Sequence, residues 1–248
     1  MTGRPDVVDH VTWQAQIDAL RVREKAHTRE GDAIAAARRR LPMVELDAAT
    51  PLNGPNGPTT LLDVFEGRRQ LIAYYFMWHT GHSAAEQCEG CTWCTTSVQE
   101  LSYLHSRDIT YAVLCQGPYD ESRRYRDFMG WQMPWYSAQE SLDALLVGRQ
   151  QGLMHLVSYL RDGDRVFETY WTNYRGVESM DYSLALMDLT VYGRQEKWED
   201  SPAEWPIYPL GADLQPMRLD GRPTAQWSRL KAGRSDDLTL KPEGSEEK

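Results

Sequence analysis

Residues 71–94 read LIAYYFMWHTGHSAAEQCEGCTWC: an apolar run, a polar loop, and three cysteines spaced three residues apart. A second apolar run follows at residues 109–115. Both runs are apolar almost without interruption, which is typical of strands buried on both faces of a parallel or mixed sheet. Between them, Cys94, Val98 and Leu101 recur at helical spacing. The order strand, cysteine loop, helix, strand predicts a βαβ unit with a right-handed crossover.

The three cysteines, Cys88, Cys91 and Cys94, fall where this helix is expected to begin. A helix N-terminus presents unpaired N–H groups and partial positive charge, which lower a thiol pKa and favour the nucleophilic thiolate. A cysteine three residues later lies one turn on and can attack a mixed disulfide formed at the first. We therefore predict that Cys88 is the nucleophile and Cys91 the resolving thiol. Cys94 shares the apolar helical face, so core packing and a third functional thiol both stay open for it.

Composition limits the classes of function. The chain has 248 residues and 41% hydrophobic content, enough to bury a core. Four cysteines are too few for a disulfide framework at this length, and their clustering favours redox or metal chemistry in a reducing compartment. The net charge of −9 repels a phosphate backbone, which argues against nucleic-acid binding. The longest apolar run is too short to cross a bilayer and residues 1–9 lack a secretory layout, so we expect a cytoplasmic protein that binds no membrane.

The segments outside the cysteine region also contain patterns that predict secondary structure. Residues 12–30 form an amphipathic pattern with Thr12 available as a cap; Gly31 interrupts it before a second helical stretch at residues 33–40. An Asp-Gly pair at residues 162–163 lies between two strand-like runs and predicts a hairpin at an antiparallel edge. From Gly211 onward we expect mostly irregular chain, with Leu238 and Leu240 as the apolar anchors of the last residues.

This order of elements resembles the thioredoxin-like fold. It is more closely similar to the bacterial thioredoxin-like family catalogued as domain of unknown function 899, whose layout is peroxiredoxin-like. The stretches that carry the resemblance are residues 71–78, 88–91, 108–114, 129–135, 161–167 and 188–190. The resemblance implies an α/β fold with a mixed central sheet flanked by helices, an N-terminal helical arm at residues 1–42, a thioredoxin-like domain at 43–198 and an irregular tail at 199–248.

Three departures from better-known relatives narrow the implied activity. Peroxiredoxins place Pro and Thr before their peroxidatic cysteine, but the corresponding positions here hold Gly81 and Ala85, which disfavours an ordinary peroxidase. The loop at residues 79–87 is longer than in thioredoxins and contains histidines. The proline that thioredoxins place opposite the cysteine pair is usually cis; counted back from Gly163, His155 falls at that position.

An imidazole opposite the cysteines suggests a metal alternative to the dithiol. Thiolate and imidazole ligands together suit Cu(I) or Zn(II). The negative charges of Glu86 and Glu89 would raise the pKa of Cys88 and so oppose the effect of the helix N-terminus. A bound cation would offset these charges. The dithiol function itself needs no cofactor. The candidate ligands of copper or zinc are Cys88, Cys91, Cys94, His79, His82 and His155.

Aromatic residues suggest a pocket near the cysteines. The chain has 9 Trp and 13 Tyr against 4 Phe, and the indole combines a large apolar surface with one polar group. Core packing is the alternative for each of them taken singly. The candidate pocket residues are Trp78, Trp93, Trp131 and Trp135.

Three functions follow as hypotheses. The first is a thiol–disulfide oxidoreductase that acts on a small-molecule or protein thiol or disulfide through its CxxC(xxC) cluster. The second is a copper or zinc protein, or a metal-dependent oxidase, built on the same cysteines. The third is a non-enzymatic interaction module that makes contacts through its N-terminal arm and acidic tail. The arm is also a candidate contact for homo-oligomers.

Overall fold

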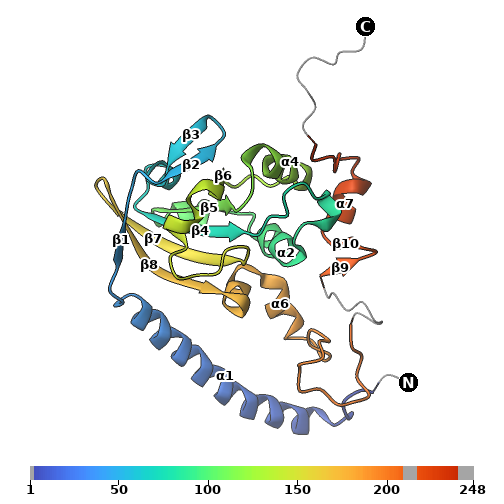
Figure 1. Ribbon diagram of the computed structural model, residues 1–248. Coiled ribbons are helices and arrows are strands. Elements are labelled where there is room, and N and C mark those ends of the chain that lie inside the picture. Colours follow the sequence, from blue (N-terminus) through green and yellow to red (C-terminus); the bar gives the residue numbers. More distant parts are fainter. Residues whose placement is uncertain (1–2, 209–216, 240–248) are drawn as a thin grey trace. The chain divides into compact units, whose positions relative to one another are not determined.

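The computed structural model describes residues 3–208 and 217–239, and Figure 1 shows their elements along the chain. The chain divides into two compact units. Of the described residues, 3–42 and 186–208 form the first unit, and 43–185 and 217–239 form the second. Within the described residues the structure thus divides the chain after residues 42 and 185, whereas sequence analysis predicts boundaries after 42 and 198.

The first unit is built on one long helix, α1 (His10–Arg38), none of whose residues is buried. It begins at Asp9, whose carboxylate accepts a hydrogen bond from the Thr12 backbone N–H at 2.9 Å. Thr12 is therefore inside the helix and is not its cap. The predicted interruption at Gly31 is also absent, because a single glycine costs a helix only about 1 kcal/mol.

The second unit is an eight-stranded sheet in the order β1-β8-β7-β4-β5-β6-β2-β3. The two apolar runs form β4 and β5, which pair in parallel along their whole length, and β7 pairs with β4 in the antiparallel sense. The predicted hairpin is present between β7 and β8. The sheet is therefore mixed, as expected. The strands are β1 (Val44–Leu46), β2 (Pro51–Gly54), β3 (Gly57–Thr60), β4 (Gln70–Phe76), β5 (Ile109–Cys115), β6 (Trp135–Ser137), β7 (His155–Asp162) and β8 (Arg165–Asn173).

Helices and 3-10 turns connect these strands or follow the last of them, and Figure 1 labels α2, α4, α6 and α7. The crossover from β4 to β5 holds two short helices where the spacing predicts one, because Thr95, Thr96 and Val98 are β-branched and disfavour continuation. The helices are α2 (Glu89–Ser97), α3 (Ser102–His105), α4 (Tyr119–Met129), α5 (Leu142–Leu145), α6 (Tyr182–Met187) and α7 (Gln226–Lys231); the 3-10 turns are η1 (Asp63–Phe65), η2 (Ala84–Glu86), η3 (Gln139–Ser141) and η4 (Tyr174–Met180).

The sheet separates two apolar clusters, one on each face. Alternate residues of β4 enter alternate clusters: Tyr74 and Phe76 lie in the first, and Ala73 and Tyr75 lie in the second. All four cysteines belong to the first cluster. We call the side of the sheet that carries this first cluster the cysteine face.

Part of the C-terminal stretch expected to be irregular is ordered. Residues 217–239 contain β9 (Arg218–Leu219), β10 (Arg222–Pro223) and α7. Leu238 is buried in the first cluster, as an apolar anchor should be, whereas Leu240 lies outside the described residues. Buried Gln226 fixes this segment with two hydrogen bonds to the sheet unit, from its Nε2 to the Ala84 carbonyl and to the Tyr125 hydroxyl, both at 2.7 Å. Polar contacts of this kind leave no periodic pattern in a sequence.

Among the described ranges, 3–208 and 217–239, no helix has the length and apolar character needed to span a membrane.

Candidate functional site

Cys88 occupies the N-cap position of α2, as its place in the sequence predicts. The backbone N–H of Cys91 donates to the Cys88 sulfur at 3.4 Å. Ser, Thr, Asp and Asn usually fill this position because their side chains accept a hydrogen bond from the first turn. A sulfur placed there accepts the same bond best when it carries negative charge. The cap geometry therefore favours a thiolate at Cys88.

The two thiols of the CxxC have opposite acidity. The pKa of Cys88 is lowered, first by a hydrogen bond from the Cys91 thiol and then by the Cys91 backbone N–H, against burial and the charge of Glu89. The pKa of Cys91 is raised well above its usual value by complete burial and by its hydrogen bond and charge interaction with Cys88. Of the two thiols, Cys88 is therefore the one that gives up its proton more readily. Cys88 retains 8% of its surface exposed and Cys91 retains none, so Cys88 is the more accessible of these two thiols.

Met77, the residue after β4, contacts both cysteines of the CxxC. Its backbone N–H donates to the Cys91 sulfur at 3.4 Å, and its own sulfur lies 3.8 Å from that of Cys88. The Thr92 hydroxyl donates to the Cys88 carbonyl at 2.8 Å and also bonds the buried Tyr125 hydroxyl at 2.7 Å. The start of α2 is thus held from the strand below it and from α4 beside it.

The loop between β4 and α2 is organised by Gln87, which is completely buried. The Gln87 side chain accepts from the His79 N–H at 3.1 Å and donates to the His79 and His82 carbonyls at 2.9 and 3.2 Å. Ser83 and Glu86 add a capping box at η2. These bonds fix the nine-residue loop immediately before Cys88.

The histidines of this loop bond to the loop itself. His79 Nδ1 lies 2.9 Å from the Glu86 carbonyl, and His82 Nδ1 lies 3.7 Å from the Glu86 carboxylate. Their rings pack edge to face, with centroids 5.7 Å apart. Neither histidine has a hydrogen bond to a cysteine among the contacts of the described residues.

His155 lies on the wrong face of the sheet for the predicted role. It pairs directly with Tyr75, whose side chain belongs to the second cluster, and directly paired residues point to the same side of a sheet. His155 Nε2 bonds the Gln150 carbonyl at 2.8 Å, and its ring packs on Trp171. Met154, one residue earlier, packs against the cysteine cluster instead. The placement of an imidazole opposite the CxxC is therefore corrected.

Cys94 is a core thiol. It is buried, and burial followed by the charge of Asp181 raises its pKa to about 12. Cys115, at the end of β5, is also buried, and burial raises its pKa to about 12. Neither residue carries thiolate at neutral pH. Within residues 3–208 and 217–239, no three His, Cys, Asp or Glu side chains come together as a metal cluster, so the candidate ligand set is not assembled there.

Three of the four tryptophans, Trp78, Trp131 and Trp135, pack in the apolar cluster of the cysteine face. Trp78, Trp131 and Trp135 are buried around Phe76, and the last two indoles stack with centroids 5.6 Å apart. Trp93 is half-buried and donates from its indole N–H to the Ser183 hydroxyl at 2.7 Å. Core packing, the alternative kept for each tryptophan, thus describes Trp78, Trp131 and Trp135.

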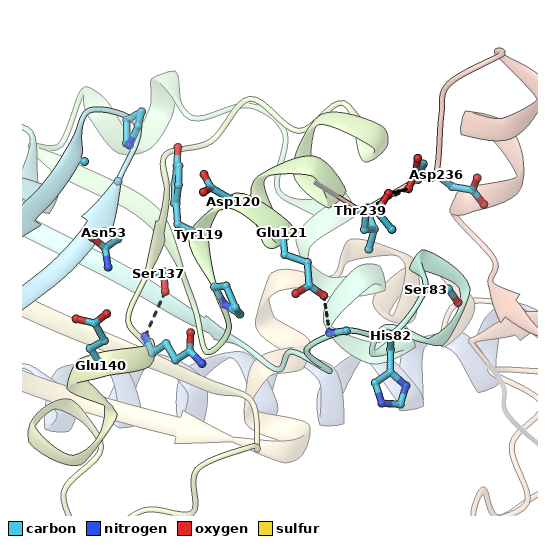
Figure 2. Close-up of a pocket in the computed structure, with 18 residues that line it drawn as sticks. Asn53, His82, Ser83, Tyr119, Asp120, Glu121, Ser137, Glu140, Asp236 and Thr239 are labelled. Carbon is cyan, nitrogen blue, oxygen red and sulfur yellow. Dashed lines mark hydrogen bonds between the residues drawn. The ribbon is translucent and has the colours of Figure 1, made fainter. Parts of the chain in front are cut away.

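A cavity of ≈ 1100 Å³ lies beside this site, and the cysteines take no part in its lining (Figure 2). It borders the loop at His82 and Ser83, the start of α4, and the segment 236–239. The Gly81 N–H donates to the Glu121 carboxylate at 2.8 Å along one wall. The cavity therefore adjoins the loop that carries Cys88 without opening onto its sulfur.

Comparison with protein families identifies the chain. The family model described as "Bacterial protein of unknown function (DUF899)" matches residues 2–208. The chain belongs to the DUF899 family. The strand order β8-β7-β4-β5, with a parallel β4–β5 crossover and an antiparallel β7–β8 hairpin, gives this DUF899 protein the thioredoxin-like layout expected from the resemblance.

Solved structures similar to this DUF899 protein include structures of a peroxiredoxin and of a thioredoxin. A cysteine-to-serine mutant of Xanthomonas campestris peroxiredoxin Q matches at 18% identity over 58% of this chain and 96% of its own, with a TM-score of 0.40. Another structure of the same peroxiredoxin matches at 17% identity over 58% and 94%, with a TM-score of 0.41. A thioredoxin from Wuchereria bancrofti matches at 15% identity over 55% and 89%, with a TM-score of 0.36. A comparison with curated proteins finds no match.

Two residues of the DUF899 site were missed by sequence analysis. Gln87 organises the loop before Cys88, and Arg218 from the C-terminal segment binds Glu89 beside Cys88. Each is a single polar residue in a polar stretch, so no spacing rule selects it. Sequence analysis suggests that a bound cation offsets the negative charge of Glu89. In the structure Arg218 forms an ion pair with this carboxylate.

Proposed function

We propose that this protein is a thiol–disulfide oxidoreductase in which Cys88 is the nucleophile and Cys91 the resolving thiol. One observation carries the proposal: the Cys88 sulfur caps α2 and accepts from Cys91, whereas Cys91 is fully buried and keeps its proton. Nucleophilic and resolving roles need this division of acidity and access.

The first step is attack by the Cys88 thiolate on one sulfur of a substrate disulfide. The new bond joins Cys88 to that sulfur, the substrate S–S bond breaks, and the second substrate sulfur leaves as a thiolate. The leaving thiolate takes up a proton. The Cys91 N–H, which stabilises the thiolate beforehand, keeps the attacking sulfur at the start of α2.

The second step releases the substrate. Cys91 gives up its proton and attacks the Cys88 sulfur, a Cys88–Cys91 disulfide forms, and the remaining substrate sulfur leaves as a thiol. The protein dithiol is oxidised by two electrons and the substrate disulfide is reduced by two. An external dithiol restores the starting state by the reverse exchange. The substrate class is a small-molecule or protein disulfide.

The order in which the cysteines react with iodoacetamide tests the assignment at its first step. We expect Cys88 to be alkylated first at pH 7, because its pKa is lowered while the pKa values of the other three thiols are raised. Cys91, Cys94 and Cys115 should react at least about 10-fold more slowly, since burial raises their pKa values. Peptide mass spectrometry of the reduced protein gives the four rates. Preferred labelling of Cys91, Cys94 or Cys115 would contradict the assignment.

A further inference from the structure

The C-terminal segment reaches the CxxC from outside the family match. We call residues 217–239 the strap. Figure 1 shows β9, β10 and α7 of the strap beside α2, and β10 contacts both α2 and η2. A Cβ placed at Gly90, between the two cysteines, would lie 3.6 Å from the sulfur of Met217. The strap therefore packs directly against the turn that contains Cys88.

Arg218 makes the polar contacts of the strap with this turn. Its Nε and Nη2 lie 3.2 and 3.1 Å from one carboxylate oxygen of Glu89. Its Nη1 donates to the Ala85 carbonyl at 2.6 Å, and Nη2 donates to the Gln87 carbonyl at 2.9 Å. All three partners lie within three residues of Cys88 in the sequence. The arginine side chain is 15% exposed and that of Glu89 is 30% exposed, so the pair is partly shielded from solvent.

We propose that Arg218 is a positioning residue of the dithiol site, acting on Cys88 through Glu89 and through the loop carbonyls of Ala85 and Gln87. The inference rests on the proposed function, because a role for the Cys88 thiolate gives this contact its purpose. Arg218 does not touch the reacting sulfur in any hydrogen bond of the described residues. Its effect is to cancel a neighbouring negative charge and to fix the approach of the chain to the helix.

The link between Arg218 and Cys88 runs through the charge of Glu89. The groups with an electrostatic interaction with this thiol include Cys91, Cys94 and Glu89 on α2, Tyr74 on β4 and Tyr125 on α4. Burial raises the pKa of both tyrosines, so both are neutral at pH 7. Glu89 is the fixed charge of this set, and it raises the pKa of Cys88. Arg218 places an opposite charge on that same carboxylate.

The pH dependence of Cys88 alkylation tests the proposal. We expect Arg218→Gln to move the midpoint of the rate profile upward by about one pH unit, since Glu89 then acts unopposed. At a pH below the midpoint, the rate should fall about 10-fold. Glu89→Gln combined with Arg218→Gln should return the midpoint to the wild-type value. A profile of Arg218→Gln that matches the wild type overturns the proposal, and so does a double variant whose midpoint stays raised.

Two further variants separate charge from structure. Arg222→Gln is the matched control, because Arg222 belongs to the same strap but pairs with Asp236 at 3.0 Å and bonds Gln226. It should leave the alkylation midpoint unchanged. Arg218→Lys keeps the positive charge and is expected to keep the midpoint close to wild type; if Arg218→Gln fails to fold, an upward shift of a full unit in Arg218→Lys contradicts the charge mechanism.

Two separate measurements distinguish this inference from the proposed function. Disulfide turnover by the wild-type protein decides whether the dithiol is an oxidoreductase. The alkylation midpoint is read from reduced protein without any substrate, and it decides the role of Arg218. Normal turnover with no midpoint shift removes the inference alone. A midpoint shift with no turnover keeps the electrostatic effect and removes the oxidoreductase.

Discussion

Cys91→Ser protein that is incubated with a disulfide should accumulate a stable mixed disulfide at Cys88. The first exchange still occurs, because Cys88 remains at the cap of α2, where the backbone N–H of residue 91 donates to its sulfur. The second exchange fails, because a serine hydroxyl cannot attack the mixed disulfide. Cys88→Ser should lose turnover altogether, since its hydroxyl is not ionised near neutral pH. Intact-mass measurement before and after reduction detects the trapped adduct, and a coupled disulfide-reduction assay gives the turnover.

Cys94→Ala provides the control for this series. Cys94 lies on the same helix and is as buried as its neighbours, but its raised pKa and core position give it no part in the exchange. Its variant should keep turnover, apart from a loss of stability from the small cavity it leaves. If Cys91→Ser keeps turnover and Cys94→Ala loses it, the resolving thiol is Cys94. Undiminished turnover by Cys88→Ser would remove the proposed mechanism.

Gln87→Ala should destabilise the protein by several kcal/mol and impair the site at the same time. The substitution removes three hydrogen bonds and leaves the backbone groups of His79 and His82 without their buried partner. Each unsatisfied buried group costs about 1–3 kcal/mol, although some of this is recovered if water enters the loop. Denaturant unfolding measures the loss of stability. Hydrogen exchange should show the loop at residues 79–87 opening far more readily than in the parent chain.

The matched control is Gln132→Ala. Gln132 is exposed, and its side chain bonds only the nearby Gly130 carbonyl at 3.2 Å among the contacts of the described residues. Its replacement should change the free energy of unfolding by less than about 0.5 kcal/mol. Equal stabilities for the two alanine variants would show that Gln87 does not hold the loop.

The parts of this structure that follow from sequence are those with a repeating signal. Continuous apolar runs predict β4 and β5, and the spacing of Cys88 and Cys91 places them at a helix start. Asp162 and Gly163 mark the turn of the β7–β8 hairpin. In each case local chemistry alone decides the structure, so neighbouring residues are enough to find it.

The sequence-based predictions fail where a contact joins residues distant in the chain, or where a shift of one residue in strand register decides which face a side chain occupies. Counting back from the hairpin correctly places His155 at the start of β7. A shift of one residue, however, turns a side chain to the other face of a sheet. Met154, and not His155, therefore packs on the cysteine face. Arg218 is 129 residues from Glu89 in the chain, and no spacing within either segment indicates their contact. A tryptophan pattern likewise shows large apolar area without showing whether it packs inward or lines a pocket.

Burial of Leu238 on the cysteine face has a consequence for related proteins. The family match ends at residue 208, whereas Leu238, Gln226 and Arg218 cover the CxxC side of the sheet from beyond that point. A shorter homologue that stops near the matched boundary would leave apolar surface and the Tyr125 hydroxyl open to water. Such a homologue must close this face with another segment or with a second protein, and its thiol would then be tuned by different neighbours. Chain length beyond the shared region thus becomes a marker for dividing the family into groups with different reactivity.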